Sequence, residues 1–395
     1  MSILDGYCEL EPRAPRDNFH MILTDTQEQI RDSVRSFARA EIAPRAVEWE
    51  QAGAYPREIF KELADLGLMG MTAPVECGGA GADYVSYALA LMELAAADGG
   101  LSTVVSVHNA PVIAAVLREA NEGQREVWLP QLCSASIIGA FALTEADAGT
   151  DAAAIHTRAR LDNADYVLNG SKQFITSGRL ADLVLTFAVT DPTAGKKGLS
   201  AFLIPTDRPG YGVAKVESKL GQRASDTCSL TFDEVRIEPE LRLGAEGDGY
   251  RIALSNLEIG RIGIAAQSVG MAQSALDIAI AYAKERFTFG HSIITHQAVG
   301  HRLADLAASL EAARQLVLHA AALKDANRPC LSEASMAKLV ASETAEKVCS
   351  GSLQTLGGYG YLEDYRVAKI YRDVRVCQIY EGTSDVQRLV IARHL

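Results

Sequence analysis

The feature that most restricts the fold of this chain is its hydrophobic periodicity, which changes twice along the sequence. Apolar side chains recur at helical spacing up to about residue 136, short β-branched runs separated by turn residues follow, and the helical spacing then returns. Few soluble proteins of this size place a β segment between two helical segments. We therefore expect a mainly helical α+β protein with a short N-terminal arm and three domains: 1–20 (arm), 21–136 (helical), 137–245 (β) and 246–395 (helical).

The first helical segment carries clear boundary signals. Thr24 and Gln27 form a T-x-x-Q capping box, an apolar face follows, and Pro44 ends the run. Further stretches with helical spacing are separated by glycine-rich breaks at 77–81 and 99–100: 56–70, 82–97 and 102–119. These signals predict an all-helical N-terminal domain.

The other two domains are predicted from turns and from helical spacing. The dipeptide Asn169-Gly170 lies between two strand-like runs and predicts a hairpin turn. Further strands are expected over 183–189, 199–204 and 229–232, which indicates a small antiparallel barrel or sandwich. Four alanine-rich helices then predict a C-terminal four-helix bundle: 249–286, 297–326, 332–356 and 365–378.

Composition excludes several kinds of partner. With 395 residues and 48% hydrophobic content, the chain can bury a large core. Its formal net charge of -12 disfavours nucleic acid and anionic membranes. We expect no stretch to span a membrane, and the acidic N-terminus does not resemble a signal or transit peptide. Seven scattered cysteines without CxxC spacing indicate a reducing compartment and no metal site, so we expect a cytoplasmic protein.

A decapeptide near the C-terminus, 379–388, is the strongest candidate for a catalytic segment. Its single early carboxylate, Glu381, follows two bulky side chains and precedes a glycine. Burial there would raise the pKa of the carboxyl group and make it an effective base. In the alternative interpretation, Ser384 caps a helix that begins at Asp385, and Glu381 is solvated.

Five motifs in order make the chain resemble an acyl-CoA dehydrogenase from Thr24 to Leu395. One resembles the T-E-x-x-x-G-[ST]-D segment of that family, another the strand that covers the flavin ring, and the last is the decapeptide with Glu381. Their positions are 141–151, 172–178, 286–297, 354–360 and 379–388. The resemblance implies the three-domain fold described above and FAD as cofactor.

The resemblance also implies which residues hold FAD. The flavin end would be held by residues of the β domain and the decapeptide: Phe141, Leu143, Thr144, Gly149, Thr150, Phe174, Thr176, Thr383 and Asp385. The pyrophosphate and adenosine would be held by Arg286, Phe289, Gln297, Gln354, Gly357 and Gly358 of a second chain, which implies a homodimer within a homotetramer. Phe174 departs from the tryptophan common at its position.

Some of these assignments have a purely structural alternative. Thr144 and Thr176 could merely satisfy the ends of strands. Arg286 could bind carbonyl groups at a helix end, and Gly357-Gly358 could be no more than a helix stop.

For the reaction, the resemblance implies that Glu381 removes the α-proton of an acyl-CoA thioester while the β-hydrogen leaves as hydride to the flavin. The product would be a trans-2-enoyl-CoA, and an electron-transfer flavoprotein would accept the electrons. Some family members carry the base on a long helix, where this chain has Gly260. The substrate would be bound by Thr150, Glu258, Arg261, Tyr380 and Gly382.

Substrate range and reaction type leave alternatives open. Residues 84–109 and 260–267 look most similar to short-chain and short/branched-chain members, although one methylene in an apolar pocket changes binding by only about 1–3 kcal/mol. A flavin oxidase, desulfinase or monooxygenase on the same scaffold is one alternative. A non-catalytic flavoprotein is another, but it would tolerate loss of the base or the phosphate contacts, and this sequence keeps both.

Overall fold

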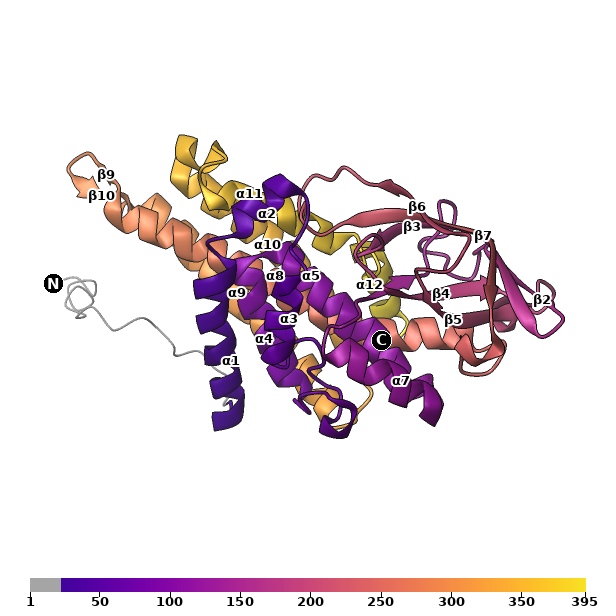
Figure 1. The fold of residues 1–395 in the computed structure, drawn as a ribbon. Coiled ribbons are helices and arrows are strands. Elements are labelled where there is room, and N and C mark those ends of the chain that lie inside the picture. The colour runs from indigo at the N-terminus through magenta and orange to yellow at the C-terminus, as the bar shows by residue number, and fades with distance from the viewer. Residues whose placement is uncertain (1–22) are drawn as a thin grey trace.

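The computed structural model describes residues 23–395, and it confirms the predicted fold of a helical part, a β part and a helical bundle (Figure 1). The predicted N-terminal arm, 1–20, lies outside the described residues. The bundle runs through the middle of the molecule. In Figure 1 the β domain lies at one end and the β9–β10 hairpin at the other.

The N-terminal part is helical throughout. Its helices are α1 (Asp25–Phe37), α2 (Ala46–Ala52), α3 (Glu58–Asp65), α4 (Tyr84–Ala97), α5 (Gly99–Val107), α6 (Ala114–Glu119) and α7 (Glu122–Cys133). The predicted capping box is confirmed: Thr24 Oγ1 accepts from the Gln27 N–H at 3.3 Å, and Gln27 Oε1 accepts from the Thr24 N–H at 3.0 Å. Helices α2 and α7 were not predicted. The stretch predicted over 102–119 is broken between α5 and α6, because Ala110 before Pro111 leaves the helical conformation.

The middle part is a mixed sheet. Its strands are β1 (Gly139–Ala142), β2 (Arg158–Asp162), β3 (Asp165–Thr176), β4 (Leu183–Val189), β5 (Leu199–Pro205), β6 (Tyr211–Val216), β7 (Thr227–Ile237) and β8 (Arg242–Leu243). They are ordered β6-β7-β3-β2-β4-β5-β8, with β1 paired to β4. Most pairs are antiparallel as predicted, but β1 and β2 run parallel to β4.

The hairpin predicted at Asn169-Gly170 is wrong. Strand β3 continues through both residues, and the turn of the hairpin lies between β2 and β3, where Asn163 has a φ of +59°. Gly170 (φ +151°) instead lies at a shift of register between β3 and β7. A Cβ atom at Gly170 would lie 2.6 Å from Thr157 Oγ1, so the glycine serves a close approach within the sheet and not a turn.

The C-terminal part confirms the predicted bundle. Its elements are α8 (Gly249–Glu285), β9 (Phe287–Thr288), β10 (His291–Ser292), α9 (Gln297–Asp325), α10 (Leu331–Leu356), α11 (Arg366–Val374) and α12 (Ser384–Ala392). Helix α8 spans the molecule. It begins against β5, where a Cβ at Gly249 would lie 2.8 Å from the Leu199 carbonyl group, and it ends at the β9–β10 hairpin.

Two helical stretches are long and apolar enough to cross a membrane, contrary to the expectation from the sequence. They are Gly99–Glu119 and α8. In the most apolar 18-residue window of each, 94% and 67% of the residues, respectively, are buried. Their apolar character is explained by burial. Both pack into the main hydrophobic core, which joins the N-terminal helices to the bundle.

A buried polar cluster also joins all three parts of the chain. Lys369 on α11 lies between two carboxylates, with its Nζ 3.0 Å from Asp98 Oδ2 and 2.5 Å from Asp373 Oδ2. Asp98 caps α5 and accepts a hydrogen bond of 2.6 Å from the Tyr55 hydroxyl group. From the β domain, Gln222 donates its Nε2–H to the Asp373 backbone oxygen at 3.2 Å. This cluster fixes α11, and the turn that follows it, against the other two parts.

Candidate active site

The segment that carries Glu381 is a strained turn between α11 and α12. Glu381 has a φ of +54°, which side-chain-bearing residues rarely adopt, and Gly382 follows with a φ of +90°. Strain of this kind persists only where the surroundings impose it, and it is concentrated at functional sites. The turn therefore directs the Glu381 side chain inward at an energetic cost.

The Glu381 carboxyl group rests directly on α8. A Cβ atom at Gly260 would lie 1.9 Å from Glu381 Oε2, so only glycine leaves room for the carboxyl group there. Oε2 is buried and has no hydrogen-bond partner among the described residues. Burial raises the pKa of Glu381 to about 7, and the charges of Lys338 and Arg261 oppose part of that rise. A carboxyl group in this state can accept a proton near neutral pH.

The alternative interpretation of the decapeptide is correct in one respect and wrong in another. A helix does begin there, but its first residue is Ser384 and its cap is Thr383, whose side chain accepts from the Val386 N–H. Asp385 is exposed and interacts with Arg388 at 3.4 Å. Because the Oε2 atom is buried, Glu381 is not a solvated residue.

Most residues expected to bind substrate lie close to Glu381. Arg261 is 7% exposed, and its Nη1 donates to Ser335 Oγ at 3.1 Å, while its Nε has no partner among the described residues. The Tyr380 hydroxyl group donates to Gln267 Oε1 at 2.8 Å. Glu258, one turn before Arg261 on α8, forms an ion pair with Lys324 at 2.8 Å.

The residues expected at the flavin ring lie where β1 and β3 end. The Gln173 N–H donates to the Thr144 oxygen at 2.8 Å, which ties the segment after β1 to β3. Lys172 fixes the same segment from inside, since its Nζ lies 3.0 Å from the Leu143 oxygen and 2.8 Å from Glu145 Oε1. Phe174 is 63% exposed with a φ of +61°, so its ring faces outward.

The remaining flavin-end residues lie nearby. Phe141 is in β1 and packs against Phe187 at 5.0 Å, and Thr176 is the last residue of β3. Gly149 and Thr150 are exposed in the loop after β1, and no atom lies within 4 Å of a Cβ placed at Gly149. The Ser177 hydroxyl group, one residue after Thr176, is buried without a partner among the described residues.

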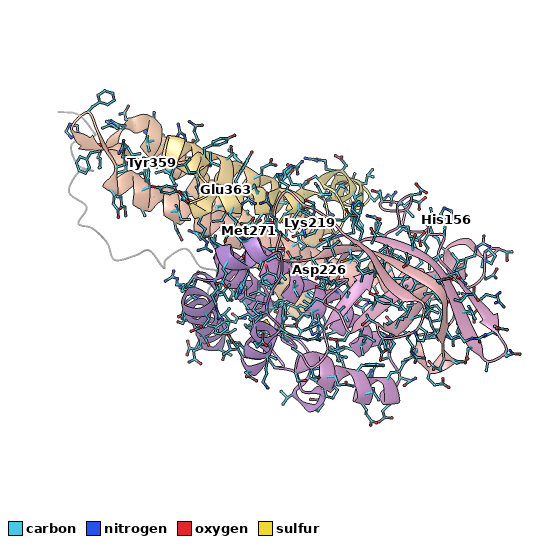
Figure 2. The ribbon with its side chains drawn as sticks, turned by 45° about the horizontal axis from the view of Figure 1, so that its top comes forward. His156, Lys219, Asp226, Met271, Tyr359 and Glu363 are labelled. Carbon is cyan, nitrogen blue, oxygen red and sulfur yellow. The ribbon has the colours of Figure 1, made fainter. Side chains whose placement is uncertain are left out.

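The residues expected at the pyrophosphate and adenosine lie at the far end of the bundle. They are exposed there around the β9–β10 hairpin and the end of α10: Arg286, Phe289, Gln297, Gln354, Gly357 and Gly358. The Arg286 guanidinium group lies 6.0 Å from the centre of the Tyr359 ring. Figure 2 shows Tyr359 at this end of the molecule and His156 in the β domain at the other. From Gly260, against which Glu381 rests, to Arg286 at its end, α8 extends about 39 Å at a rise of about 1.5 Å per residue.

Both groups have features that suit a flavin dinucleotide. Phe289 is 94% exposed, and a Cβ at Gly357 (φ +61°) or Gly358 would meet no atom within 4 Å, which leaves backbone open to a ligand. Gly357 also ends α10, as its structural interpretation predicted. Arg286 takes no part in an ion pair among residues 23–395, so its charge is available to a phosphate. The unpartnered Ser177 hydroxyl group adds a free donor at the flavin end.

Sequence reasoning missed several neighbours of Glu381. Lys338 on α10 donates from its Nζ to the Gly382 oxygen at 2.7 Å, and Gln267 on α8 binds Tyr380. Lys338 occupies the buried face of α10 together with Ala334, Ala337 and Ala341. A lysine at a core position of a helix was the signal that could have identified it.

Comparison with known proteins identifies the family. Models of the acyl-CoA dehydrogenase N-terminal, middle and C-terminal domains match residues 24–136, 140–235 and 247–395. An acyl-CoA dehydrogenase of Bacillus subtilis (strain 168) is 46% identical over 375 residues, which cover 95% of this chain and 99% of that protein. The mitochondrial short-chain specific acyl-CoA dehydrogenase of Homo sapiens is 42% identical over 373 residues, 94% of this chain and 90% of that protein.

A solved structure agrees with these relatives. Butyryl-CoA dehydrogenase from Megasphaera elsdenii superposes with a TM-score of 0.93 at 39% identity, covering 95% of this chain and 99% of that one. The chain therefore belongs to the acyl-CoA dehydrogenase family, and it is an FAD-dependent oxidoreductase that acts on acyl-CoA thioesters.

Proposed function

We propose that this enzyme converts short straight-chain or 2-methyl-branched acyl-CoA thioesters, of about four or five carbons, to the trans-2-enoyl-CoA. Glu381 is the base that removes the α-proton in this proposal. An electron-transfer flavoprotein then accepts the electrons. Two relatives named above support a short acyl group: the butyryl-CoA dehydrogenase and the short-chain specific acyl-CoA dehydrogenase.

The position of the Glu381 carboxyl group is the single observation that carries this proposal. It is buried on α8 against Gly260, its Oε2 is free to accept a proton, and its pKa is raised to about 7. Because Gly260 has no side chain, α8 offers no second carboxylate at that point. Bound FAD supplies the acceptor for the β-hydrogen. Thus the chain has to provide a base, substrate contacts and a dry surface.

The division of the expected FAD residues supports a cofactor shared between two copies of the chain. The flavin must meet the substrate beside Glu381, which rests on Gly260, and Arg286 lies about 39 Å further along α8 at a rise of about 1.5 Å per residue. A single dinucleotide does not bridge that distance. In a homodimer, the β domain of one copy would hold the flavin and the hairpin end of its partner would hold the pyrophosphate. Two such dimers would form the proposed tetramer.

Replacing the base tests the proposal. Glu381→Gln should keep FAD bound but slow anaerobic bleaching of the flavin band by butyryl-CoA by at least about 10²-fold, since general base catalysis is lost. Glu126→Gln, at an exposed position on α7, is the matched control and should bleach at the wild-type rate. A near wild-type rate for Glu381→Gln would show that another group is the base.

The pH dependence gives a second measure of the same base. Only the ionised carboxylate accepts a proton, and the pKa of Glu381 is raised to about 7. The value of kcat/KM for butyryl-CoA should therefore fall as the pH decreases through about 7. A rate that stays constant down to about pH 5 would contradict this assignment.

The acyl chain and the electron acceptor need separate assays. With an artificial acceptor, kcat/KM for saturated acyl-CoA from four to sixteen carbons should peak at the short end. A maximum at twelve carbons or more would refute the short-chain proposal and leave the dehydrogenase assignment intact. After reduction by substrate, the enzyme should be reoxidised faster by purified electron-transfer flavoprotein than by air. Turnover with oxygen at the same rate would favour an oxidase.

A further inference from the structure

Lys338 is a buried charged residue that the proposed reaction does not use. Its side chain, on α10, is 0% exposed and shares its face of the helix with alanines. An ammonium group in apolar surroundings is unfavourable unless a partner compensates it. The partner is the backbone oxygen of Gly382, which accepts a hydrogen bond of 2.7 Å from Lys338 Nζ. Gly382 is the residue that follows the proposed base.

The bond from Lys338 supports the strained turn. Both Glu381 and Gly382 have positive φ angles, of +54° and +90°. Besides Lys338, the buried Gln387 donates its Nε2–H to the Gly382 oxygen at 2.9 Å and to the Glu381 oxygen at 3.2 Å. Two side chains from two helices thus hold the carbonyl groups on which the direction of the Glu381 side chain depends.

Lys338 is also one of two positive charges that act on the Glu381 carboxyl group. The groups that face this carboxyl group are Arg261 from α8, Lys338 from α10 and Tyr87 from α4, with Cys377 beside Lys338. Burial raises the pKa of Tyr87 and of Cys377, so both are neutral at pH 7. Burial lowers the pKa of Lys338 to about 8, which leaves most of the ammonium charged where Glu381 ionises.

We propose that Lys338 is a positioning residue for the base, which holds the Glu381–Gly382 turn through the Gly382 oxygen and favours the ionised carboxylate through its charge. This inference rests on the proposed role of Glu381. Arg261 is less suited to this task, because its Nη1 donates to Ser335 and, among the described residues, it forms no hydrogen bond with the turn. Among residues 23–395, Lys338 alone combines a buried positive charge with a direct bond to the turn.

Three substitutions separate the charge from the hydrogen bond. Lys338→Met removes both, Lys338→Gln keeps a donor without the charge, and Lys338→Arg keeps the charge. In the Met and Gln variants, the acid limb of the kcat/KM profile for butyryl-CoA should move up by about one pH unit, as expected when an opposite charge is lost nearby. Activity at pH 6 should then fall about tenfold and recover partly at pH 9. Lys338→Arg should keep the wild-type limb.

The controls distinguish a change in the base from a general loss of structure. Flavin content and melting temperature are measured for each variant, and Lys284→Met, at an exposed position on α8, should match the wild type. If Lys338→Met does not fold, Lys338→Gln decides. An unmoved acid limb in a flavin-loaded Lys338→Gln enzyme, with Glu381→Gln inactive, would overturn this inference alone. Full activity of Glu381→Gln would overturn both the proposed base and this inference.

Discussion

Gly260 offers a sharp test of how the base is placed. In Gly260→Ala the new Cβ atom would lie 1.9 Å from Glu381 Oε2 and 2.7 Å from its Cδ, whereas real Cβ contacts below 3.0 Å essentially do not occur. The carboxyl group must therefore move by about 1 Å. A misplacement of about 1 Å can cost about 10²-fold in rate, which corresponds to about 2.7 kcal/mol of activation free energy.

The expected loss is catalytic and not structural. Alanine favours a helix over glycine by about 1 kcal/mol, so α8 itself should not be destabilised. The assay is stopped-flow bleaching of the flavin by butyryl-CoA without oxygen, at equal flavin content. Gly123→Ala on α7 is the control, because a Cβ there would meet only Asn121 Oδ1 at 3.6 Å. Bleaching of Gly260→Ala within twofold of the wild type would refute the proposed contact between the carboxyl group and α8.

Three further predictions follow from buried or exposed charges. Burial lowers the pKa of His108 to about 4, whereas the imidazole of the unfolded chain binds a proton near pH 6.5. The free energy of unfolding, measured in urea, should therefore fall by about 3 kcal/mol between pH 6.5 and pH 4. His108→Gln should flatten that dependence. Lys172→Met leaves the buried Glu145 carboxylate without its charged partner, with only the His156 and Thr157 N–H groups still donating to it, and should cost about 3–5 kcal/mol. The melting temperature should fall, and Glu145→Gln should partly restore it in the double variant. An unchanged melting temperature would contradict this prediction. Arg286→Ala should release FAD and weaken the dimer in sizing chromatography, and unchanged flavin content at low protein concentration would count against the shared site.

Local signals in the sequence were sufficient for most of the fold. The capping box at Thr24 depends on residues three positions apart, and the strand predicted over 183–189 coincides with β4. Asn169-Gly170 misled because the same glycine can serve a turn or a close approach between strands. In the structure, Gly170 is required because Thr157 packs closely against it. That contact forms only in the folded sheet, so the sequence around Asn169-Gly170 does not show it.

In the candidate site too, the sequence predicted some residues, while the contacts between them became clear only from the folded structure. Glu381 and Gly260 could be paired from the sequence through the family resemblance, but the contact between them depends on the crossing of α8 and the turn before α12. Lys338 was missed because a single lysine in a helix is usually solvated. Its burial is decided by what packs over α10, and helical spacing alone does not supply that information.

The length of α8 has a consequence for mixtures of variants. If one copy supplies Glu381 and its partner supplies Arg286, the two residues of one active site belong to different chains. A dimer that pairs a Glu381→Gln chain with an Arg286→Ala chain then has one site with both changes and one site with neither. Two preparations that are each inactive should therefore regain activity when they are unfolded, mixed and refolded together. Restored activity would mean that Glu381 and Arg286 of one chain belong to two different active sites, which α8 keeps apart.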